Sequence, residues 1–301
     1  MEYAVIIPMR EMEGNPHIGS LLTSLAEQSF PPVEVHVVVG DRRQGRAINI
    51  GVSKTEARYV GTLDDDTVID DPELFGKLLR HLESHVDTGL AGAACEIPQS
   101  ASAFQKKAMK EIPRRYFPVQ RGDVESDMVQ HPCLLMHREL FLRIGGEDED
   151  LIRGLDPVLR KKVRDCGLKV VIVKETWVYH LVPDGLWGLL RMYYRNGRGS
   201  GYAQRHYPGR VLELSDGFDQ GLFVERRNLP FRILRRIGGG CAALARLQWL
   251  KFLVDGAYVA GVTREMLLPS KQVVSGEVVD VESQRLEGFP FKVSIHRVRL
   301  D

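Results

Sequence analysis

The sequence predicts an α/β fold with a mostly parallel sheet, helices on both of its faces, and a C-terminal appendage of helices and strands. In the first third of the chain, short apolar runs rich in Val and Ile alternate with segments whose apolar residues recur at helical spacing. Uninterrupted apolar strands are typical of parallel strands that are buried on both faces. The composition of the 301 residues, 44% hydrophobic and 27% charged, is that of a folded globular protein.

The first elements are expected in the order βαβαβα. The helix before the second strand is indicated by Ile18, Leu21, Leu22 and Leu25, which follow helical spacing. Strand and helix alternation of this kind implies right-handed crossovers and a ligand site at the carboxyl ends of the strands. The remaining elements are expected at Ala4–Pro8, Val33–Val39 and Tyr59–Leu63 for strands, and at Ala47–Glu56 and Pro72–Val86 for helices.

The rest of the chain is less regular. Residues 95–135 combine three prolines with several basic residues and are expected to form a helix plus irregular loops. The tail from Gln272 to Leu300 alternates apolar and polar residues, which predicts strands in a small appended hairpin or sheet. Between these regions we expect strands at Leu134–Met136 and Val170–Val173, and helices at Glu139–Ile144 and Pro157–Cys166.

Charge and hydropathy restrict the partners. A net charge of +1 supplies no overall field for nucleic acid, and no such partner is expected. The apolar stretch Tyr3–Pro8 is too short for a signal sequence, which favours a cytoplasmic protein. The longest apolar region, Gly238–Val262, contains Arg246, Lys251 and Asp255, so a membrane span is not expected. This amphipathic region leaves open packing within the protein, a homodimer interface, or contact with the inner face of a membrane.

Three consecutive carboxylates follow the third expected strand. Asp64, Asp65 and Asp66 stand where a parallel sheet exposes its ligands. Adjacent carboxylates repel one another, and a cation such as Mg²⁺ or Mn²⁺ that prefers oxygen ligands relieves this repulsion. The alternative is a solvated acidic turn that caps the helix starting at Pro72, a role that Asp70 or Asp71 could serve.

A second group of polar residues follows the second strand. Asp41 could accept a hydrogen bond from a nucleobase or a ribose hydroxyl, although a turn residue explains it nearly as well. Arg42, Arg43 and Arg46 could meet a diphosphate at the same edge, although loop arginines are commonly only solvated. The chain has neither the G-x-G-x-x-G pattern after its first strand nor a P-loop pattern, so those nucleotide-binding modes are not supported.

These residues occur in the order and spacing of a known family. Over residues 3–202, the chain resembles glycosyltransferase family 2, which has the GT-A fold with its Rossmann-like sheet. The resemblance implies a catalytic domain at 1–205 and a C-terminal extension at 206–301. It rests on the blocks Ala4–Pro8, Leu21–Ser29, Val35–Asp41, Ala47–Val52, Tyr59–Asp66, Arg138–Gly146, Leu155–Gly167 and Val178–His180.

The resemblance implies a reaction and its metal site. In this family an acceptor hydroxyl attacks the anomeric carbon of a nucleotide sugar while the diphosphate leaves. Asp64 and Asp66 would hold Mn²⁺ or Mg²⁺, and His180 would join the metal or the diphosphate, although a buried core histidine remains the alternative. The residues implied for the nucleotide or donor are Pro8, Arg10, Asp41, Arg46, Asn49, Asp64, Asp65 and Arg195.

The general base implied by the resemblance is Asp156, which gives inversion at the anomeric carbon. The family has a Glu directly before this Asp, whereas this chain has Leu155. Asp156 before Pro157 is also a good helix start on physical grounds alone. The nearby residues Glu147–Asp150 would form a mobile acidic loop, mostly exposed to solvent.

The segment Arg191–Tyr202 is aromatic, basic and rich in glycine. It could form a flexible lid that closes over a diphosphate, or simply the end of an amphipathic helix.

The function implied is an inverting glycosyltransferase of the hexosyltransferase type, with a nucleotide diphosphate sugar as donor and a glycan, lipid or small molecule as acceptor. A sugar-phosphate nucleotidyltransferase is an alternative, but it would need a Gly-rich, basic loop after the first strand, where Pro8–Glu11 stand here. A catalytically degenerate binding or scaffold protein is a third interpretation, prompted by Leu155 and by the short loop after Asp41.

Overall fold

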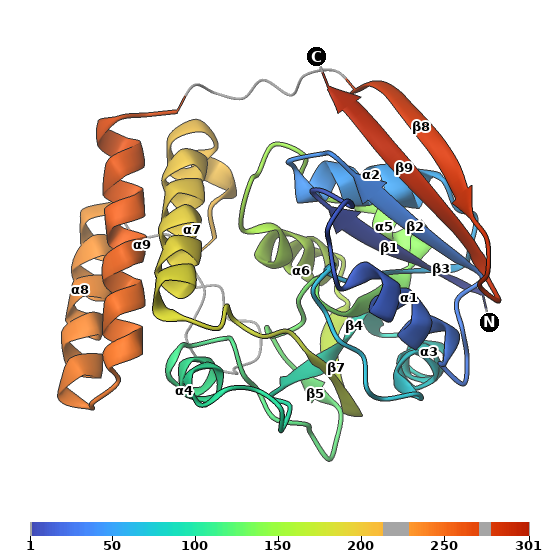
Figure 1. Ribbon diagram of the computed structural model, residues 1–301, viewed down its shortest axis with the longest axis horizontal. Helices are drawn as coiled ribbons and strands as arrows, with labels where there is room; N and C mark the ends of the chain where they lie inside the picture. The colour runs from blue at the N-terminus through green and yellow to red at the C-terminus, as the bar shows by residue number, and fades with distance from the viewer. Residues whose placement is uncertain (1, 213–228, 271–277, 301) are drawn as a thin grey trace.

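The protein is described here from a computed structural model that covers residues 2–212, 229–270 and 278–300 (Figure 1). Its centre is a sheet that contains nine strands in the described residues, in the order β5-β7-β4-β6-β3-β1-β2-β9-β8. The strands are β1 (Tyr3–Met9), β2 (Glu34–Val39), β3 (Tyr59–Thr62), β4 (Thr88–Glu96), β5 (Val124–Glu125), β6 (Leu134–His137), β7 (Lys169–Tyr179), β8 (Val278–Leu286) and β9 (Lys292–Leu300).

Most of the central strands run in one direction. Strand β1 is parallel to β2 and β3, β4 is parallel to β7, and β6 lies antiparallel between β3 and β4. Strands β1, β2, β3, β4 and β7 therefore point the same way, and their carboxyl ends lie along one edge. The predicted mixed α/β architecture is confirmed.

Helices cover both faces of the sheet. Helices α1 (Ile18–Ala26) and α3 (Leu74–Ser84) pack on one face, whose core includes Val5 and Ile7. Neighbouring Ile6 points into the core of the other face, because side chains alternate along a strand. That second core is formed with α2 (Gln44–Ser53), α4 (Ala103–Glu111), α5 (Arg138–Arg143) and α6 (Leu155–Asp165).

The sequence did not predict β4, although it lies in the middle of the sheet. Five of its nine residues, TGLAGAACE, are Ala or Gly, which have low strand propensity and give no apolar alternation. The following region contains a helix, α4, and loops, as predicted, together with the two-residue strand β5. Helix α2 begins at Gln44, three residues before its predicted start.

Three long helices form a separate layer beside the sheet (Figure 1). They are α7 (Leu186–His206), α8 (Leu229–Ala245) and α9 (Trp249–Leu267). A Cβ atom at Gly197 of α7 would lie 2.1 Å from the carbonyl oxygen of Tyr258, and one at Gly261 of α9 would lie 2.2 Å from that of Tyr194. The glycines of the Arg191–Tyr202 segment thus serve close helix packing within a continuous helix, and the lid interpretation has no support in this geometry.

The C-terminal hairpin of β8 and β9 does not form a sheet of its own. Strand β9 pairs in parallel with β2, from Glu34–Lys292 to Val39–Arg297, and so extends the central sheet. The division into residues 1–205 and 206–301 stays a prediction, but this pairing joins the last part of the chain to the first. Part of the tail, residues 271–277, lies outside the described residues.

Buried histidines link the hairpin to the sheet. His36 Nδ1 lies 2.9 Å from His296 Nε2, His296 Nδ1 lies 2.8 Å from Ser283 Oγ, and His36 Nε2 lies 2.9 Å from Glu34 Oε2. Two neutral imidazoles satisfy all three contacts, since each then donates one hydrogen bond and accepts one. Burial and then His36 lower the pKa of His296 to about 4, and burial lowers the pKa of His36.

No helix in the described residues is long and apolar enough to cross a membrane.

The histidine chain predicts an acid-sensitive hairpin. Because both folded-state pKa values lie below the ordinary value of about 6.5, the contribution of neutral histidines to stability is complete above pH 6.5 and is lost as the pH falls towards 4. We expect the free energy of unfolding to fall by roughly 1–2 kcal/mol more between pH 7 and pH 5 in the wild type than in His296→Gln. Urea unfolding at both pH values measures this. The exposed His85→Gln should keep the wild-type dependence, and an unchanged slope in His296→Gln would contradict the assignment.

Candidate active site

The active-site residues predicted from the sequence lie at the carboxyl edge of the sheet. Asp41 follows β2, Asp64 follows β3, and His180 follows β7. A backbone bridge between Val68 and Tyr179 joins the turn after β3 to the end of β7. Strands that are separated in the sheet thereby bring the acidic turn and His180 together.

Asp64, Asp66 and His180 form a group that could hold a metal ion. His180 Nε2 lies 3.2 Å from Asp66 Oδ1 and 3.8 Å from Asp64 Oδ2. Asp64 Oδ1 accepts a hydrogen bond of 2.8 Å from Gln44, and Asp65 Oδ2 accepts one of 2.8 Å from Asn15. Asp65 therefore points away from the metal group, while one oxygen of Asp64 and one of Asp66 face the imidazole.

The pKa values of this group show how strongly its members interact. Burial raises the pKa of Asp64 to about 6, an effect that His180 opposes and Asp66 reinforces. Burial would raise the pKa of Asp66 as well, but the hydrogen bond with His180, the charge of His180 and a backbone hydrogen bond together outweigh it and lower that pKa. Burial would lower the pKa of His180, yet Asp66 and Asp64 raise it. The group thus attracts positive charge, and His180 supplies part of it in the absence of a cation.

The acidic turn does not cap the helix that follows it. Asp71 performs that role, because its Oδ1 accepts the backbone N–H of Glu73 and its carbonyl accepts that of Leu74. Asp64, Asp65 and Asp66 turn instead through a hydrogen bond from the Thr67 N–H to the Asp64 carbonyl. Asp71 thus serves the start of the helix, as the capping alternative allowed, whereas Asp64, Asp65 and Asp66 make no such contact within the described residues.

Asp156 lies in the first turn of α6, beside a histidine that the sequence did not single out. The backbone N–H of His131 donates to Asp156 Oδ1 at 2.8 Å, and Nδ1 lies 2.7 Å from the same oxygen. On its other side, His131 Nε2 lies 2.8 Å from Glu147 Oε1. Buried His131 therefore bridges two carboxylates (side chain 3% exposed), of which Glu147 is fully buried (0%) and Asp156 is partly exposed (32%).

Electrostatics make His131 a cation. Burial would lower its pKa, but Asp156 and Glu147 raise it well above the ordinary value. In return, the pKa of Asp156 is lowered far below its usual range, because the effect of His131 exceeds that of burial. Both His131 contacts use Oδ1, and Oδ2 has no hydrogen-bond partner in the described residues. Asp156 is thus a permanently ionised carboxylate with one free oxygen.

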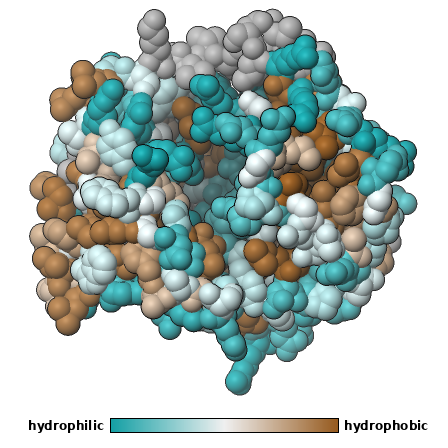
Figure 2. All heavy atoms as spheres, in the orientation of Figure 1, coloured by the Kyte–Doolittle hydropathy of each residue, from teal (hydrophilic) through white to brown (hydrophobic). Residues whose placement is uncertain are grey.

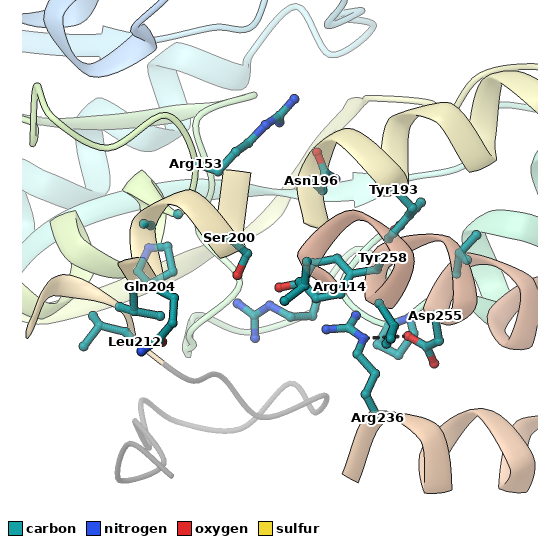
Figure 3. Close-up of a pocket in the computed structure, with 18 of the residues that line it drawn as sticks. Arg114, Arg153, Tyr193, Asn196, Ser200, Gln204, Leu212, Arg236, Asp255 and Tyr258 are labelled. Carbon is teal, nitrogen blue, oxygen red and sulfur yellow. Dashed lines mark hydrogen bonds and ion pairs between the residues drawn. The ribbon is translucent and has the colours of Figure 1, made fainter. Parts of the chain in front are cut away.

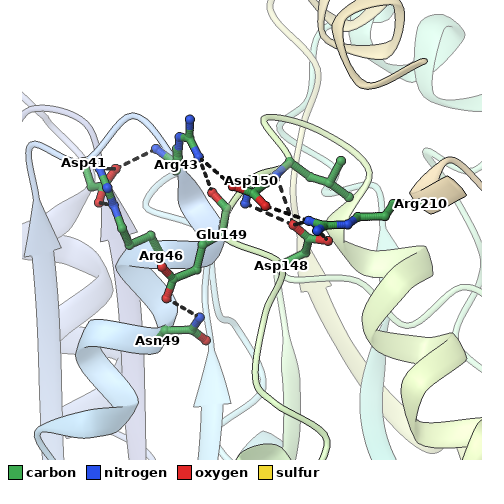
Figure 4. Close-up of polar contacts among 9 residues, drawn as sticks. Asp41, Arg43, Arg46, Asn49, Asp148, Glu149, Asp150 and Arg210 are labelled. Carbon is green, nitrogen blue, oxygen red and sulfur yellow. Dashed lines mark hydrogen bonds and ion pairs between the residues drawn. The ribbon is translucent and has the colours of Figure 1, made fainter. Parts of the chain in front are cut away.

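Other predicted donor-binding residues are held by protein partners (Figure 4). Arg46 Nε donates to Asp41 Oδ2 at 2.5 Å, and both side chains are buried. Asp41 Oδ1 also accepts the backbone N–H of Arg43 at 2.9 Å. Asn49 binds Glu147 through both its amide nitrogen and its oxygen, and it contacts Glu149 Oε1 at 2.8 Å. Asp41 and Arg46 lie at the predicted carboxyl edge of the sheet, whereas Asn49 binds the loop Glu147–Asp150.

That loop, Glu147–Asp150, differs from the exposed and mobile loop that was expected. Only Glu149 is exposed, while Glu147 is buried. Arg43 donates to the Glu149 carbonyl at 2.9 Å, and Arg210 Nη1 lies 3.1 Å from Asp148 and 2.8 Å from Asp150 (Figure 4). Arginines from two distant segments therefore fasten the acidic loop. The expectation of a mostly exposed loop was wrong.

Three arginines stand around the cleft. Arg115 Nε donates to the Tyr193 hydroxyl at 3.0 Å, and the aliphatic stem of Arg153 packs over Gly199, so both lie against α7, which also carries exposed Arg195. Burial, followed by the charges of Arg195 and Arg115, lowers the pKa of Arg153, while Asp64 and Asp156 oppose this effect. Neither Arg153 nor Arg195 has a carboxylate partner within the described ranges. The cleft thus combines positive charge with its acidic group.

The structure gives less support to two of the residues predicted to bind the nucleotide-sugar donor, Pro8 and Arg10. Pro8 is buried within β1 and pairs with Val38. Arg10 is exposed, and its charged neighbour is Glu11, with nitrogen and oxygen 3.9 Å apart. Neither residue makes a contact with the metal group, so their donor roles stay predictions.

A cavity of about 440 Å³ lies behind the start of α6 (Figure 3). Its wall includes Gly154 and Pro157, the neighbours of Leu155 and Asp156, and it extends to α8 at Gly239. Asn196 and Ser200 of α7 also line it, and Asn196 Oδ1 is a buried oxygen without a hydrogen-bond partner in the described part of the chain. The wall of the cavity therefore combines polar and apolar residues, and it lies next to Asp156, the candidate base.

Comparisons with solved structures concern the fold. A mannosyltransferase from Pyrobaculum calidifontis, PcManGT, solved in complex with GDP-Man and Mn²⁺, aligns with a TM-score of 0.56 and 15% identity, over 88% of this chain and 87% of that chain. S. aureus TarS aligns with a TM-score of 0.44 and 15% identity, over 97% of this chain and 60% of that chain. No match was found among curated protein sequences.

The fold is thus of the GT-A type. Residues 24–145 match the family model of glycosyl transferase family 2, and this range lies within the residues 3–202 over which the sequence resembles that family. The matched range includes Asp41, the acidic turn and His131.

The His131 bridge predicts strong coupling between buried charges. Removing His131 leaves Glu147 as an unpaired carboxylate in the core, so we expect His131→Leu to lower the free energy of unfolding by about 3–5 kcal/mol. The double variant His131→Leu/Glu147→Leu removes both charges and should recover part of that loss. Urea unfolding of the two single variants and the double variant measures the coupling. Strictly additive effects would contradict the bridge.

Proposed function

We propose that the protein is an inverting glycosyltransferase that moves a hexose from a nucleotide diphosphate sugar to an acceptor hydroxyl. The observation that carries the proposal is that a metal-binding group and a separate ionised carboxylate lie at one edge of the sheet, close enough for Asp156 to influence the pKa of Asp64. Asp64, Asp66 and His180 form the first, and Asp156 with its free Oδ2 forms the second. The chain's family segment and its GT-A fold support the proposal.

The residues present fit a divalent ion. Two carboxylates and an imidazole suit Mn²⁺, and Mg²⁺ would be held mainly by the oxygen ligands. The raised pKa of Asp64 reflects a carboxylate that burial and Asp66 disfavour as an anion, and a cation would relieve both effects. When bound, the ion neutralises the charge that accumulates on the departing diphosphate. The complex of PcManGT with GDP-Man and Mn²⁺ supports this assignment.

The arginines of the cleft complete the charge balance. The ion offsets the charges of Asp64 and Asp66, so the diphosphate needs further cations. Arg153 and Arg195 are suited to this role, since neither has a carboxylate partner in the described residues. Asp41 and Arg46, which bind each other at the end of β2, would receive the nucleoside. If a nucleobase took over one of the hydrogen bonds between Asp41 and Arg46, the polar atoms of this buried pair would all still have partners.

Asp156 serves as the general base. The acceptor oxygen forms a bond to the anomeric carbon while the bond from that carbon to the diphosphate oxygen breaks. The acceptor proton passes to Asp156 Oδ2, and attack opposite the leaving group inverts the anomeric centre. A hydroxyl becomes strongly acidic only as the new bond forms, so a weak base is sufficient. His131 keeps this base ionised and fixes its orientation through Oδ1.

The alternative functions have less support. A nucleotidyltransferase would need a Gly-rich, basic loop after β1, whereas exposed Arg10 there stands beside Glu11. A degenerate scaffold protein was suggested by Leu155, yet this residue is buried in the core and leaves Asp156 in place. Glu147 supplies a second carboxylate beside the base by way of His131.

Donor binding should require the metal. We expect calorimetry to detect a nucleoside diphosphate in the presence of Mn²⁺ and little binding without it. Asp66→Asn should weaken this binding by at least about tenfold, because it removes one anionic ligand. The exposed Asp87→Asn, which makes the same change beside Lys169, is the matched control. Equal binding with and without Mn²⁺, or no binding of any nucleoside diphosphate, would defeat the proposal.

Removal of the base should affect turnover and leave donor binding intact. We expect Asp156→Asn to lower kcat by about 10²–10⁴-fold while the affinity for the nucleoside diphosphate stays within a few-fold. Asp165→Asn, at the exposed far end of the same helix, should leave both quantities unchanged. Transfer assays with a screened donor sugar measure the rate. Normal turnover in Asp156→Asn would place the base elsewhere.

A further inference from the structure

The outer face of α8 is apolar and exposed. Leu234 is 66% exposed, Ile237 50% and Leu244 49%, and Leu247 after the helix reaches 81%. Figure 2 shows apolar side chains gathered over the helical layer, at the left of the molecule. Large apolar residues that are exposed singly are ordinary, but several on one face of one helix indicate an interaction surface.

Helical spacing separates this face from the packed one. Leu234, Ile237 and Leu244 lie at positions i, i+3 and i+10, on one side of the helix. The opposite side packs against α9, because Arg236 Nε lies 2.8 Å from Asp255 and Ala243 is buried. The apolar residues therefore belong to a second stripe that faces away from the protein within its described part. Packing against α9 explains the inner side of α8, but it does not explain the apolar residues on the outer side.

The charged residues of the segment 229–254 all have one sign. Residues 229–254 contain four arginines and one lysine and no acidic residue. Arg235 and Arg246 are exposed and have no carboxylate partner among the described residues, but Arg235 stands on the side of α8 that lines the cavity of Figure 3. Arg236 and Lys251 are both paired with Asp255, the first acidic residue that follows. The unpaired Arg246 beside exposed Leu244 and Leu247, in a segment whose charged residues are all basic, thus distinguishes this surface from the rest of the protein, whose net charge is only +1.

We propose that the outer face of α8, formed by Leu234, Ile237, Leu244 and Leu247, docks onto the surface of an anionic phospholipid membrane. The apolar side chains would enter the boundary between headgroups and acyl chains, as those of a helix lying in the plane of the interface do. Arg246 would extend its aliphatic stem along the apolar layer and place its guanidinium group among lipid phosphates. The proposal does not depend on the transfer reaction.

A second copy of the chain is a less suitable partner. In a twofold dimer, the same surface patch occurs on both subunits, so the arginines of one copy would approach those of the other. An anionic bilayer provides the opposite charge along the whole helix.

The test is sedimentation of the full chain with vesicles. We expect binding to phosphatidylcholine vesicles that contain phosphatidylglycerol to exceed binding to pure phosphatidylcholine by at least about tenfold, and to weaken with added NaCl. The variant Leu234→Glu/Ile237→Glu should lose at least about tenfold in affinity. Val86→Glu is the matched control, because Val86 is 90% exposed and follows α3, which lies across the molecule from α8 in Figure 1.

Each outcome decides the proposal. Far-ultraviolet circular dichroism and a thermal melt first confirm that the double variant is folded. Weakened binding of the folded double variant, with normal binding of Val86→Glu, supports the proposal. Failure of the wild type to bind anionic vesicles, or equal binding by the double variant, overturns it. A concentration-dependent dimer in solution that the double variant abolishes, without vesicle binding by the wild type, would show that copies of the chain cover this face.

Discussion

The arrangement of the cleft depends on the common direction of five strands. Because β1, β2, β3, β4 and β7 all end at one edge of the sheet, residues that follow different strands meet there. Asp64 and His180 are more than one hundred residues apart, yet His180 Nε2 lies 3.8 Å from Asp64 Oδ2. Antiparallel β6 between β3 and β4 does not disturb this, because it brings His131, which precedes it, to the same edge. The topology alone thus assembles the charged groups.

A cleft that collects carboxylates at one edge must also supply positive charge. The protein does this in two ways: His131 is a buried cation between Asp156 and Glu147, whereas the acidic turn has only His180. The first arrangement is complete, since each histidine nitrogen has a carboxylate. The second leaves excess negative charge and a raised pKa at Asp64. This difference in environment would suit the carboxylates to the different roles proposed for them, Asp156 as a base and Asp64 and Asp66 as ligands for an ion.

Much of the fold could be predicted because its strands are made of Val and Ile, and its site residues follow those strands directly. Asp64 and His180 were found in this way. Strand β4 was not, because Ala and Gly fill it where close packing leaves little room. His131 was missed because its partners, Glu147 and Asp156, are 16 and 25 residues away and follow no local pattern. Nor does any local pattern predict that β9 pairs with β2, across about 260 residues.

The glycines of α7 and α9 show that a glycine-rich segment can serve close helix packing as well as backbone flexibility. In a loop, Gly197 and Gly261 would mean freedom of the backbone. Here each admits a carbonyl group of the facing helix, so α7 and α9 approach closely and are held together. Helix α7 also carries Arg195 towards the cleft, and α9 binds α8 through Asp255. The helical layer therefore connects the cleft to the outer face of α8 through tightly packed helices, and a surface that orients α8 would also orient the cleft.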